Sequence, residues 1–478
     1  MTTLTPPPLA PQIPPAPPAP RAAPPTAMNR WWVVLGAILI QLCLGAIYAW
    51  SVFTPSLKAE PFRFSTERTQ WIFSIGLATF AVVMVLAGKW QARSGPTIVA
   101  RIGGVVLGLG YVLGGLASRT LTGDTAFWAL LVTVGLIGGA GIGLAYVVPI
   151  AVGVKWFPDR KGMITGLAVA GFGFGALIWI YLGQGLPDWT GIKTTGLIKT
   201  LGLANVFLAY GIAFFVLVLI GSIWMKNPPD GWQPAGWKAA ASGPAGAGGA
   251  GVQFESGQML GTAQFYMLWF MFVVGALAGL MVIGIIKLFG IDALQARAGL
   301  SLEQASVTAG TAMALFYALA NGLGRIVWGI LSDRLGRKLS LVLMLGIQGV
   351  VMLLFFYMGG HRGLLFLGAA LIGFNFGGNF ALFPAATADY FGNRNVGKNY
   401  GWMFTAYGVG GIVGPIMAGK FSDAGAAAVQ AAATQADKLA AALNAWFPAF
   451  IIAGVGCLVA AVVGLGLRAP RPPRAAVG

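Results

Sequence analysis

Arg325 is the residue with the clearest potential for chemistry, because we interpret it as the one charge embedded in an apolar stretch, the stretch 305–331. In a membrane, such a charge costs at least about 2.5–3.5 kcal/mol, so it usually has a partner or a function. No Asp or Glu lies in the middle of an apolar stretch to pair with it. Since a guanidinium matches a carboxylate in bidentate geometry, the sequence favours an anionic ligand. The alternative is snorkelling, because Leu331 is six residues away, about 9 Å along a helix.

Residue types that support other chemistry are scarce. The single histidine, His361, lies in a short predicted loop, and the two cysteines, Cys43 and Cys457, each lie within an apolar stretch. A disulfide framework or a metal site needs more of these ligands in closer spacing. The sequence therefore predicts no metal, no cofactor and no enzyme activity.

The elements that must position Arg325 are apolar helices. Of the 478 residues, 57% are hydrophobic and only 9% are charged, whereas soluble domains have about 25% charged residues. About 20 apolar residues span a membrane as a helix. Twelve such stretches are predicted, at 31–57, 69–89, 99–117, 125–154, 162–182, 201–224, 264–289, 305–331, 339–358, 364–387, 400–418 and 443–467.

The net charge of +17 does not indicate nucleic-acid binding, because the basic residues lie in short connections between apolar stretches. If both termini face the cytoplasm, the inner segments contain 18 Lys and Arg and the outer loops contain 11. Such an excess of basic residues is typical of the cytoplasmic side. We therefore predict a multi-pass inner- or plasma-membrane protein with both termini cytoplasmic.

The chain divides into two related halves. Gly88 and Gly329 open similar loops 241 residues apart, and Pro149 and Pro384 are matched at an offset of 235. This repetition predicts an all-α membrane protein of two pseudo-symmetric six-helix bundles. The predicted regions are a disordered proline-rich cytoplasmic tail (1–29), the first bundle (30–225), a cytoplasmic linker (226–262), the second bundle (263–467) and a cytoplasmic tail (468–478).

The segment GILSDRLGRK at Gly329–Lys338 resembles the signature loop of the major facilitator superfamily. The first-half copy departs from that pattern, with Ala92 in place of the aspartate and with Pro96 and Thr97 in place of the basic pair. Asp333 can pair with Arg337 or accept hydrogen bonds from the N-terminus of an adjacent helix, and either contact would hold helix ends together in one state of a transport cycle. The candidate gating residues of the two loop systems are Asp333, Arg334, Arg337, Lys155, Asp159 and Arg160.

A narrower resemblance, to the oxalate/formate antiporter family, covers residues 30–467. It rests on GAIYAWSVF, KWFPDRKG, NPPDGW, QFYMLW, NGLGRIVWGILSDRLGRK and NYGWMFTAYG. The resemblance implies alternating access around a central site for small carboxylates such as oxalate, formate, lactate or pyruvate. The substrate-binding arginine of that family falls at Arg325.

Members of that family that carry oxalate have a lysine where this chain has Tyr407 and a glutamine where it has Ile47. A phenol donates a hydrogen bond but supplies no positive charge to a second carboxylate. The prediction is therefore a secondary transporter of a monocarboxylate, of the formate, lactate or pyruvate class. Oxalate/formate exchange is the alternative transporter function, and a membrane sensor that transports nothing is the alternative of another class.

Other side chains at similar depth are expected to line the site, although aromatic residues also pack between helices in any membrane bundle. Tyr48 and Tyr146 are favoured because they have polar tips, while Asn379 could bind substrate or bond across helices. The predicted lining residues besides Arg325 and Tyr407 are Tyr48, Tyr146, Asn379, Phe376, Phe380, Phe404 and Trp50.

No carboxylate is predicted within the spans to relay protons, so the sequence leaves two forms of coupling open. Transport proceeds by exchange, or the substrate carries its own proton. The expected partners are a small carboxylate and the lipid bilayer, with the protein acting as a monomer.

Overall fold

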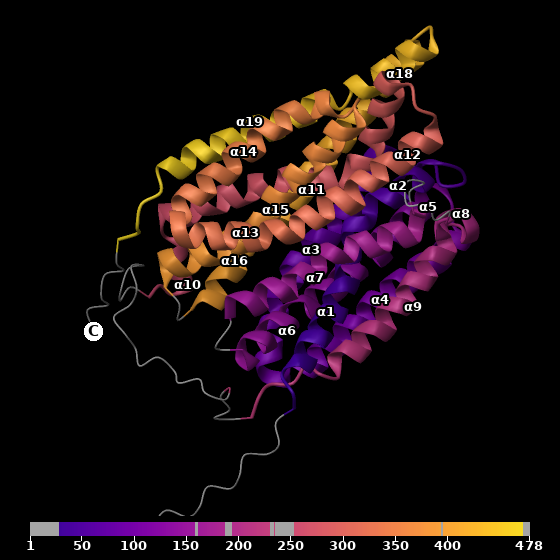
Figure 1. The fold of residues 1–478 in the computed structure, drawn as a ribbon. Helices are drawn as coiled ribbons and strands as arrows, with labels where there is room; N and C mark the ends of the chain where they lie inside the picture. Colours follow the sequence, from indigo (N-terminus) through magenta and orange to yellow (C-terminus); the bar gives the residue numbers. More distant parts are fainter. Residues whose placement is uncertain are drawn as a thin grey trace, which may run out of the picture.

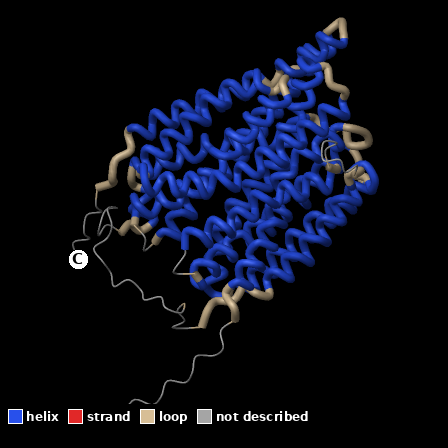
Figure 2. Tube along the Cα trace, in the orientation of Figure 1, coloured by secondary structure: helices blue, strands red, loops and turns tan. Residues whose placement is uncertain are grey.

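The structure, a computed structural model, describes residues 28–157, 161–186, 194–229, 234, 253–392 and 395–471. Within these ranges the chain forms helices, turns and short loops, and no strand (Figure 2). Most of the predicted tail 1–29 and of the predicted linker 226–262 lies outside the described residues. So do Asp159, Arg160 and residues 472–478.

Helices occupy all twelve predicted stretches, three of them as consecutive helical segments. The first half contains α1 (Trp31–Leu44), η1 (Gly45–Ala49), α2 (Trp50–Lys58), α3 (Thr66–Ser94), α4 (Pro96–Thr120), α5 (Gly123–Leu130), η2 (Leu131–Gly138), α6 (Gly139–Trp156), α7 (Lys161–Gln184), α8 (Leu197–Leu201) and α9 (Leu203–Ser222). The second contains α10 (Ser256–Leu260), α11 (Ala263–Ala298), α12 (Leu302–Thr311), η4 (Ala312–Tyr317), α13 (Ala318–Leu335), α14 (Arg337–Met358), α15 (Arg362–Phe391), α16 (Val396–Ala424), α17 (Ala426–Ala431), α18 (Gln435–Asn444) and α19 (Phe447–Leu465).

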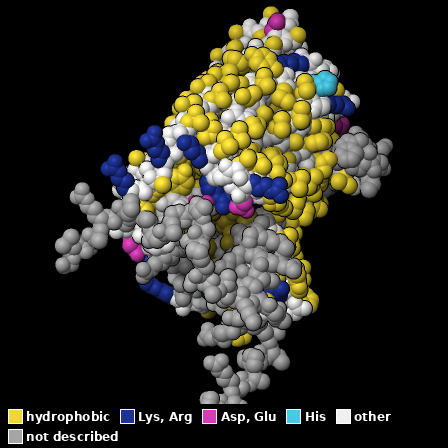
Figure 3. All heavy atoms as spheres, turned by 60° about the vertical axis from the view of Figure 1, so that its left-hand side comes forward, with side chains coloured by type: hydrophobic (Ala, Val, Ile, Leu, Met, Phe, Trp, Pro, Cys, Tyr) yellow, Lys and Arg dark blue, Asp and Glu magenta, His cyan; other side chains and the backbone are white. Residues whose placement is uncertain are grey.

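Among the described residues, ten helical segments are long and apolar enough to cross a membrane. The other two predicted spans correspond to α7, whose apolar part is Val169–Gln184, and to α16. Large apolar side chains such as Val82, Ile212 and Val462 are exposed on the flanks, and Figure 3 shows hydrophobic side chains over much of one such face. Lipid is the solvent that suits such a surface.

The two halves lie side by side as two groups of helices (Figure 1). They meet along a seam where α3 packs on α16, α7 on α13, and α2 on α11. We call the end of the bundle where α9 ends and α11 begins the linker side, and the opposite end, where α12 begins and α18 lies, the far side.

Three membrane spans change their helical pitch, and two of the altered segments, η1 and η4, contact the other half. The first span is interrupted by the 3₁₀ segment η1, and the fourth and eighth spans by the π-helical segments η2 and η4. Tyr48 lies within η1, Tyr146 lies eight residues after η2, and Arg325 lies eight residues after η4. Such interruptions are frequent at functional sites because they turn the following side chains relative to a regular helix.

Candidate functional site

Arg325 is buried at the seam, with 4% of its surface exposed. Its Nη1 donates a hydrogen bond to the carbonyl oxygen of Val169 in the other half (3.0 Å), and its Nε donates to Oδ1 of Asn321 on its own helix (3.2 Å). The guanidinium carbon lies 4.2 Å from the centre of the Phe380 ring. The side chain therefore points into the protein and does not snorkel to its surface.

The Arg325 guanidinium retains a free donor. Its Nη2 is buried and has no hydrogen-bond partner among the described residues. None of the ion pairs in the described part of the chain includes Arg325. A buried donor without an acceptor costs about 1–3 kcal/mol, and more when it is charged. The centre of the seam is therefore electrostatically suited to an anion.

Aromatic side chains from both halves form a wall around this centre. Tyr146 contacts Phe80 (ring centroids 5.0 Å apart) and Phe404 (6.4 Å), and Phe376 contacts Phe380 (5.4 Å). The structure thus brings together six of the predicted lining aromatics, which are Tyr48, Tyr146, Phe376, Phe380, Phe404 and Tyr407.

The two halves touch within this wall through a pair of phenols. The hydroxyl oxygens of Tyr48 and Tyr407 lie 3.0 Å apart and share a hydrogen bond. Both side chains are buried, and Tyr48 also lies within electrostatic reach of Arg325. Tyr407, which the resemblance implied as a lining residue, therefore lies at the centre of the seam.

Two predicted lining residues have other surroundings. Trp50 donates its indole N–H to the carbonyl oxygen of Thr69 (2.9 Å) and packs on Phe53, so it belongs to packing within the first half. Asn379 donates to the carbonyl oxygen of Phe376 on its own helix (3.1 Å), while its Oδ1 is buried without a partner among the described residues. No bond from Asn379 to another helix is present, so its free oxygen stays a candidate polar contact.

Phe80 and Phe172 also belong to the wall, although the sequence did not single them out. Phe172 packs on Tyr48 (4.9 Å) and Tyr146 (5.5 Å), and Phe80 packs on Tyr407 (5.7 Å). Nothing in the sequence separates these phenylalanines from others in apolar stretches, because the direction of each side chain depends on the rotation of its helix.

Lys287 is a second buried cation, so the expectation that Arg325 is the only charge within a span was wrong. It was counted with the outer loops, but α11 continues to Ala298 and Lys287 is 4% exposed. Its ammonium donates to Oε1 of Gln184 in the other half (2.6 Å). The signal that could have found it is its position inside the predicted stretch 264–289.

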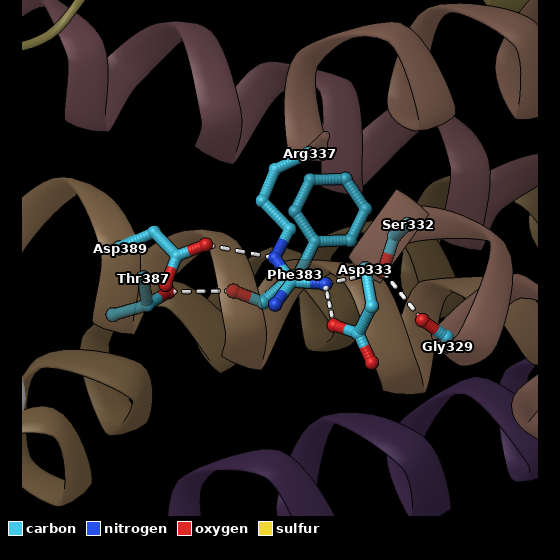
Figure 4. Close-up of polar contacts among 7 residues, drawn as sticks. All are labelled: Gly329, Ser332, Asp333, Arg337, Phe383, Thr387 and Asp389. Carbon is cyan, nitrogen blue, oxygen red and sulfur yellow. Dashed lines mark hydrogen bonds and ion pairs between the residues drawn. The ribbon is translucent and has the colours of Figure 1, made fainter. Parts of the chain in front are cut away.

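The loop that follows α13 contains a charged cluster, shown in Figure 4. Arg337 pairs with Asp333 (2.8 Å) and with Asp389 on α15 (2.8 Å), and it donates to the Ser332 hydroxyl. The predicted Asp333–Arg337 pair is confirmed, and in this conformation it lies within the second half. Arg334 is exposed, and Lys155 in the first half donates to Oδ1 of Asn227 (3.0 Å).

The far side of the seam is closed by polar contacts between the halves. The Asp423 carboxylate accepts hydrogen bonds from the backbone N–H groups of Thr66 (2.8 Å) and Glu67 (2.7 Å), at the start of α3. Gln70 donates to the carbonyl oxygen of Gly284 (3.2 Å). Among the described residues, no hydrogen bond or ion pair joins the halves nearer the linker side than the bond between Arg325 and Val169. Within the described part of the chain, the polar contacts between the halves are therefore concentrated toward the far side.

Comparison with known proteins gives consistent matches. The sequence model of the Major Facilitator Superfamily matches residues 39–316 and 294–477. An uncharacterized MFS-type transporter YhjX of Escherichia coli (strain K12) is 30% identical over 80% of this chain and 86% of its own length. The oxalate:formate antiporter of Oxalobacter formigenes is 26% identical, over 81% of this chain and 83% of its own.

Two further comparisons extend these matches. The apicoplast pyruvate carrier 1 of Toxoplasma gondii is 26% identical, over 79% of this chain and 81% of its own. The crystal structure of a bacterial homologue of the human lysosomal transporter Spinster, inward-facing and occupied, superposes with a TM-score of 0.63 at 16% identity. That match covers 91% of this chain and 96% of the other, and it shows a shared fold.

Proposed function

Because this chain belongs to the major facilitator superfamily, we propose that it is a secondary transporter of a small monocarboxylate that binds to Arg325. The observation that carries this proposal is the buried guanidinium, whose Nη2 has no acceptor among the described residues. A carboxylate would supply that acceptor and neutralise the charge in one step. Relatives named for oxalate, formate and pyruvate support a small carboxylate as the substrate.

A substrate with one negative charge suits the aromatic wall around Arg325 better than a substrate with two. Around Arg325 the described polar side chains are phenols and amides, and Tyr407 occupies the position at which the resemblance implies a lysine in oxalate carriers. A dianion would leave one carboxylate without a counter-ion in a buried site. Oxalate/formate exchange therefore stays the second candidate, favoured by the relative that carries that name.

The contacts at the seam suggest how access alternates. For the far side to open, the Asp423 bonds to α3 and the Lys287–Gln184 bond must break. For the site to open fully, the Tyr48–Tyr407 bond must also break. Each half keeps its internal packing while the seam opens at one end at a time, which is rocking of two rigid bundles.

We assign the linker side to the cytoplasm. The predicted inner segments contain 18 Lys and Arg, and the outer loops contain 11, or 10 once Lys287 is counted within α11. This difference follows the rule that basic residues stay on the cytoplasmic side. In that orientation, the conformation described here is closed toward the outside.

The test is binding and counterflow with purified protein in proteoliposomes, using radiolabelled formate, lactate, pyruvate and oxalate. Arg325→Ala should weaken binding of the transported acid by at least about 100-fold, since each hydrogen bond to a charged group contributes roughly 1.5–3 kcal/mol. Arg325→Lys should retain little activity because it loses the planar fork. Counterflow at the wild-type rate in a well-folded Arg325→Ala variant would refute the proposal, and wild type without counterflow for any acid would favour a sensor.

Tyr407→Lys separates the two carboxylate classes. A second cation at the wall should shift preference toward oxalate by roughly ten- to several-hundred-fold, which corresponds to one charge pair in a partly wet site at about 1.5–4 kcal/mol. The measurement is competition by oxalate and by pyruvate against the labelled acid. A wild type that already prefers oxalate would replace the monocarboxylate proposal with the exchanger.

A further inference from the structure

Lys287 is the charged residue that the proposed site does not use. It lies on α11, is 4% exposed, and donates to Oε1 of Gln184 at the end of α7, 2.6 Å away and across the seam. Gln184 in turn lies directly against Gly310 of α12, where an added Cβ would meet its amide group. Three helices from both halves therefore enclose this ammonium.

The surroundings of Lys287 are rich in donors and poor in acceptors. None of the ion pairs in the described ranges includes Lys287, and its single described bond is to a neutral amide. Asp292, the one acid on α11, accepts a hydrogen bond from the Trp446 indole (2.8 Å). The Gln184 Nε2 is itself buried without a partner in the described chain. An ammonium has three N–H donors, so this pair of side chains offers several donors that lack an acceptor.

This donor cluster is separate from the Arg325 site. Gln184 lies fifteen residues beyond Val169, the residue of α7 that contacts Arg325, which corresponds to about 22 Å along a helix. The neighbouring helix gives the same result, because Gly310 lies fifteen residues before Arg325. A small carboxylate cannot contact both cations at once, so Lys287 does not replace the lysine that is absent at Tyr407.

The cluster lies at the far side of the seam, where the halves must part for the site to open in that direction. One turn from Lys287 on α11, the carbonyl oxygen of Gly284 accepts from Gln70 of the other half. When these contacts separate, Lys287 and Gln184 face each other across the opening with their donors unpaired. A cation at such a mouth raises the local concentration of anions.

We propose that Lys287 and Gln184 form a second anion-binding station at the far-side mouth of the transport path. It holds the carboxylate of the transported acid before or after its stay at Arg325, and this assignment rests on the proposed function. When the far side closes, the Gln184 oxygen takes the place of the substrate oxygen on the ammonium. The station thus speeds binding of the acid from the far side. When the seam closes without substrate, Gln184 supplies Lys287 with a neutral hydrogen-bond partner.

The experiment compares Lys287→Gln, Lys287→Arg and wild type for uptake of labelled pyruvate and formate from each side. Intact cells present one face of the protein, and inverted membrane vesicles present the other. Lys199→Gln is the matched control, because Lys199 also bonds across the far side, to Glu303 (3.2 Å), but is mostly exposed. Its loss removes a far-side positive charge without touching the station.

Lys287→Gln should raise the KM for uptake from the far side about tenfold or more and change the KM from the other side less than twofold. Lys287→Arg should stay close to wild type, and so should Lys199→Gln. An unchanged far-side KM for Lys287→Gln would overturn the station. An equal rise in KM on both sides would also overturn it, because it would indicate a purely structural role for Lys287. A wild type that takes up neither acid from either side would instead overturn the proposed function and the station with it.

Discussion

The second and eighth membrane helices are each followed by the same backbone turn, but among the described residues only the later turn carries a charged cluster. Gly95 has φ 83° and ψ 156°, and Gly336, 241 residues later, has φ 82° and ψ 155°. After Gly336, Arg337 pairs with Asp333 and Asp389. After Gly95, the hydroxyl of Thr97 donates to the carbonyl oxygen of Met225 (2.6 Å).

This difference shows that the backbone conformation of the turn and the charged cluster around it are separate requirements. The region near φ +80° and ψ +155° is accessible essentially to glycine alone, so both turns need that residue to reverse the chain between helices. The charged cluster is an additional interaction, found where α14 and α15 must be held together. In the first half, bonds without an ion pair tie the equivalent turn and Lys155 to the segment after α9.

The largest effect should come from removing either glycine. Gly95→Ala and Gly336→Ala should each destabilise the protein by about 1–3 kcal/mol, because the strain lies in the backbone and not in crowding. No described atom lies within 4 Å of a Cβ placed at either position. Thermal unfolding of the purified protein measures the loss. The controls are Gly88→Ala and Gly346→Ala, which are uncrowded glycines of α3 and α14 with ordinary helical backbone, and which should be neutral or stabilising by up to about 1 kcal/mol. Equal losses of stability at all four positions would contradict the claim that the two turns need glycine for its backbone conformation.

Removing the charges should come next. Arg337→Gln should cost about 1–2 kcal/mol, since Arg337 is largely buried and serves two carboxylates, whereas Asp333→Asn should cost about 0.5 kcal/mol or less because Asp333 is mostly exposed. At about 1 M salt, where the Debye length is near 3 Å, the Arg337→Gln loss should shrink. A loss that is independent of salt would show that Arg337 acts through packing and not through charge.

The uncharged turn should show a smaller loss than Arg337→Gln. Thr97→Val keeps the shape of the side chain but removes the bond to Met225, which should cost about 0.5–1.5 kcal/mol. Unlike the Arg337 variant, this loss should be the same at low and at high salt. The test is to measure unfolding curves of both variants in parallel across a salt series. A salt-dependent loss of stability in Thr97→Val would contradict the distinction between the two turns.

Much of the fold follows from the sequence because a membrane helix is defined by the length and continuity of its apolar run. The twelve stretches could be placed for that reason. The end of α11 could not, because the apolar run ends near 289 while the helix continues to Ala298, and the sequence does not show whether Lys287 is buried. Its burial depends on Gln184, more than a hundred residues earlier in the chain.

The site was predictable where a side chain is conspicuous by its chemistry. Arg325 stands out because charge is rare in a membrane helix. Aromatic residues do not stand out, and Tyr48 and Trp50 illustrate why. Two residues apart on a helix, they point in nearly opposite directions, so Tyr48 reaches Tyr407 while Trp50 turns to Thr69. Which of the two faces the centre depends on the rotation of the first span, which the 3₁₀ segment η1 sets.

The carboxylate of Asp423 makes the hydrogen exchange of two backbone amides depend on whether the far side is open or closed. The first N–H groups of a helix have no partner within that helix, so those of Thr66 and Glu67 depend on a residue of the other half. Their hydrogens exchange slowly with deuterium while the far side is shut, and they are released to water each time it opens. The exchange rate at these two positions therefore reports how much of the time the far side of an unlabelled, unmutated carrier is open, and a substrate that lengthens one state of the cycle changes that rate.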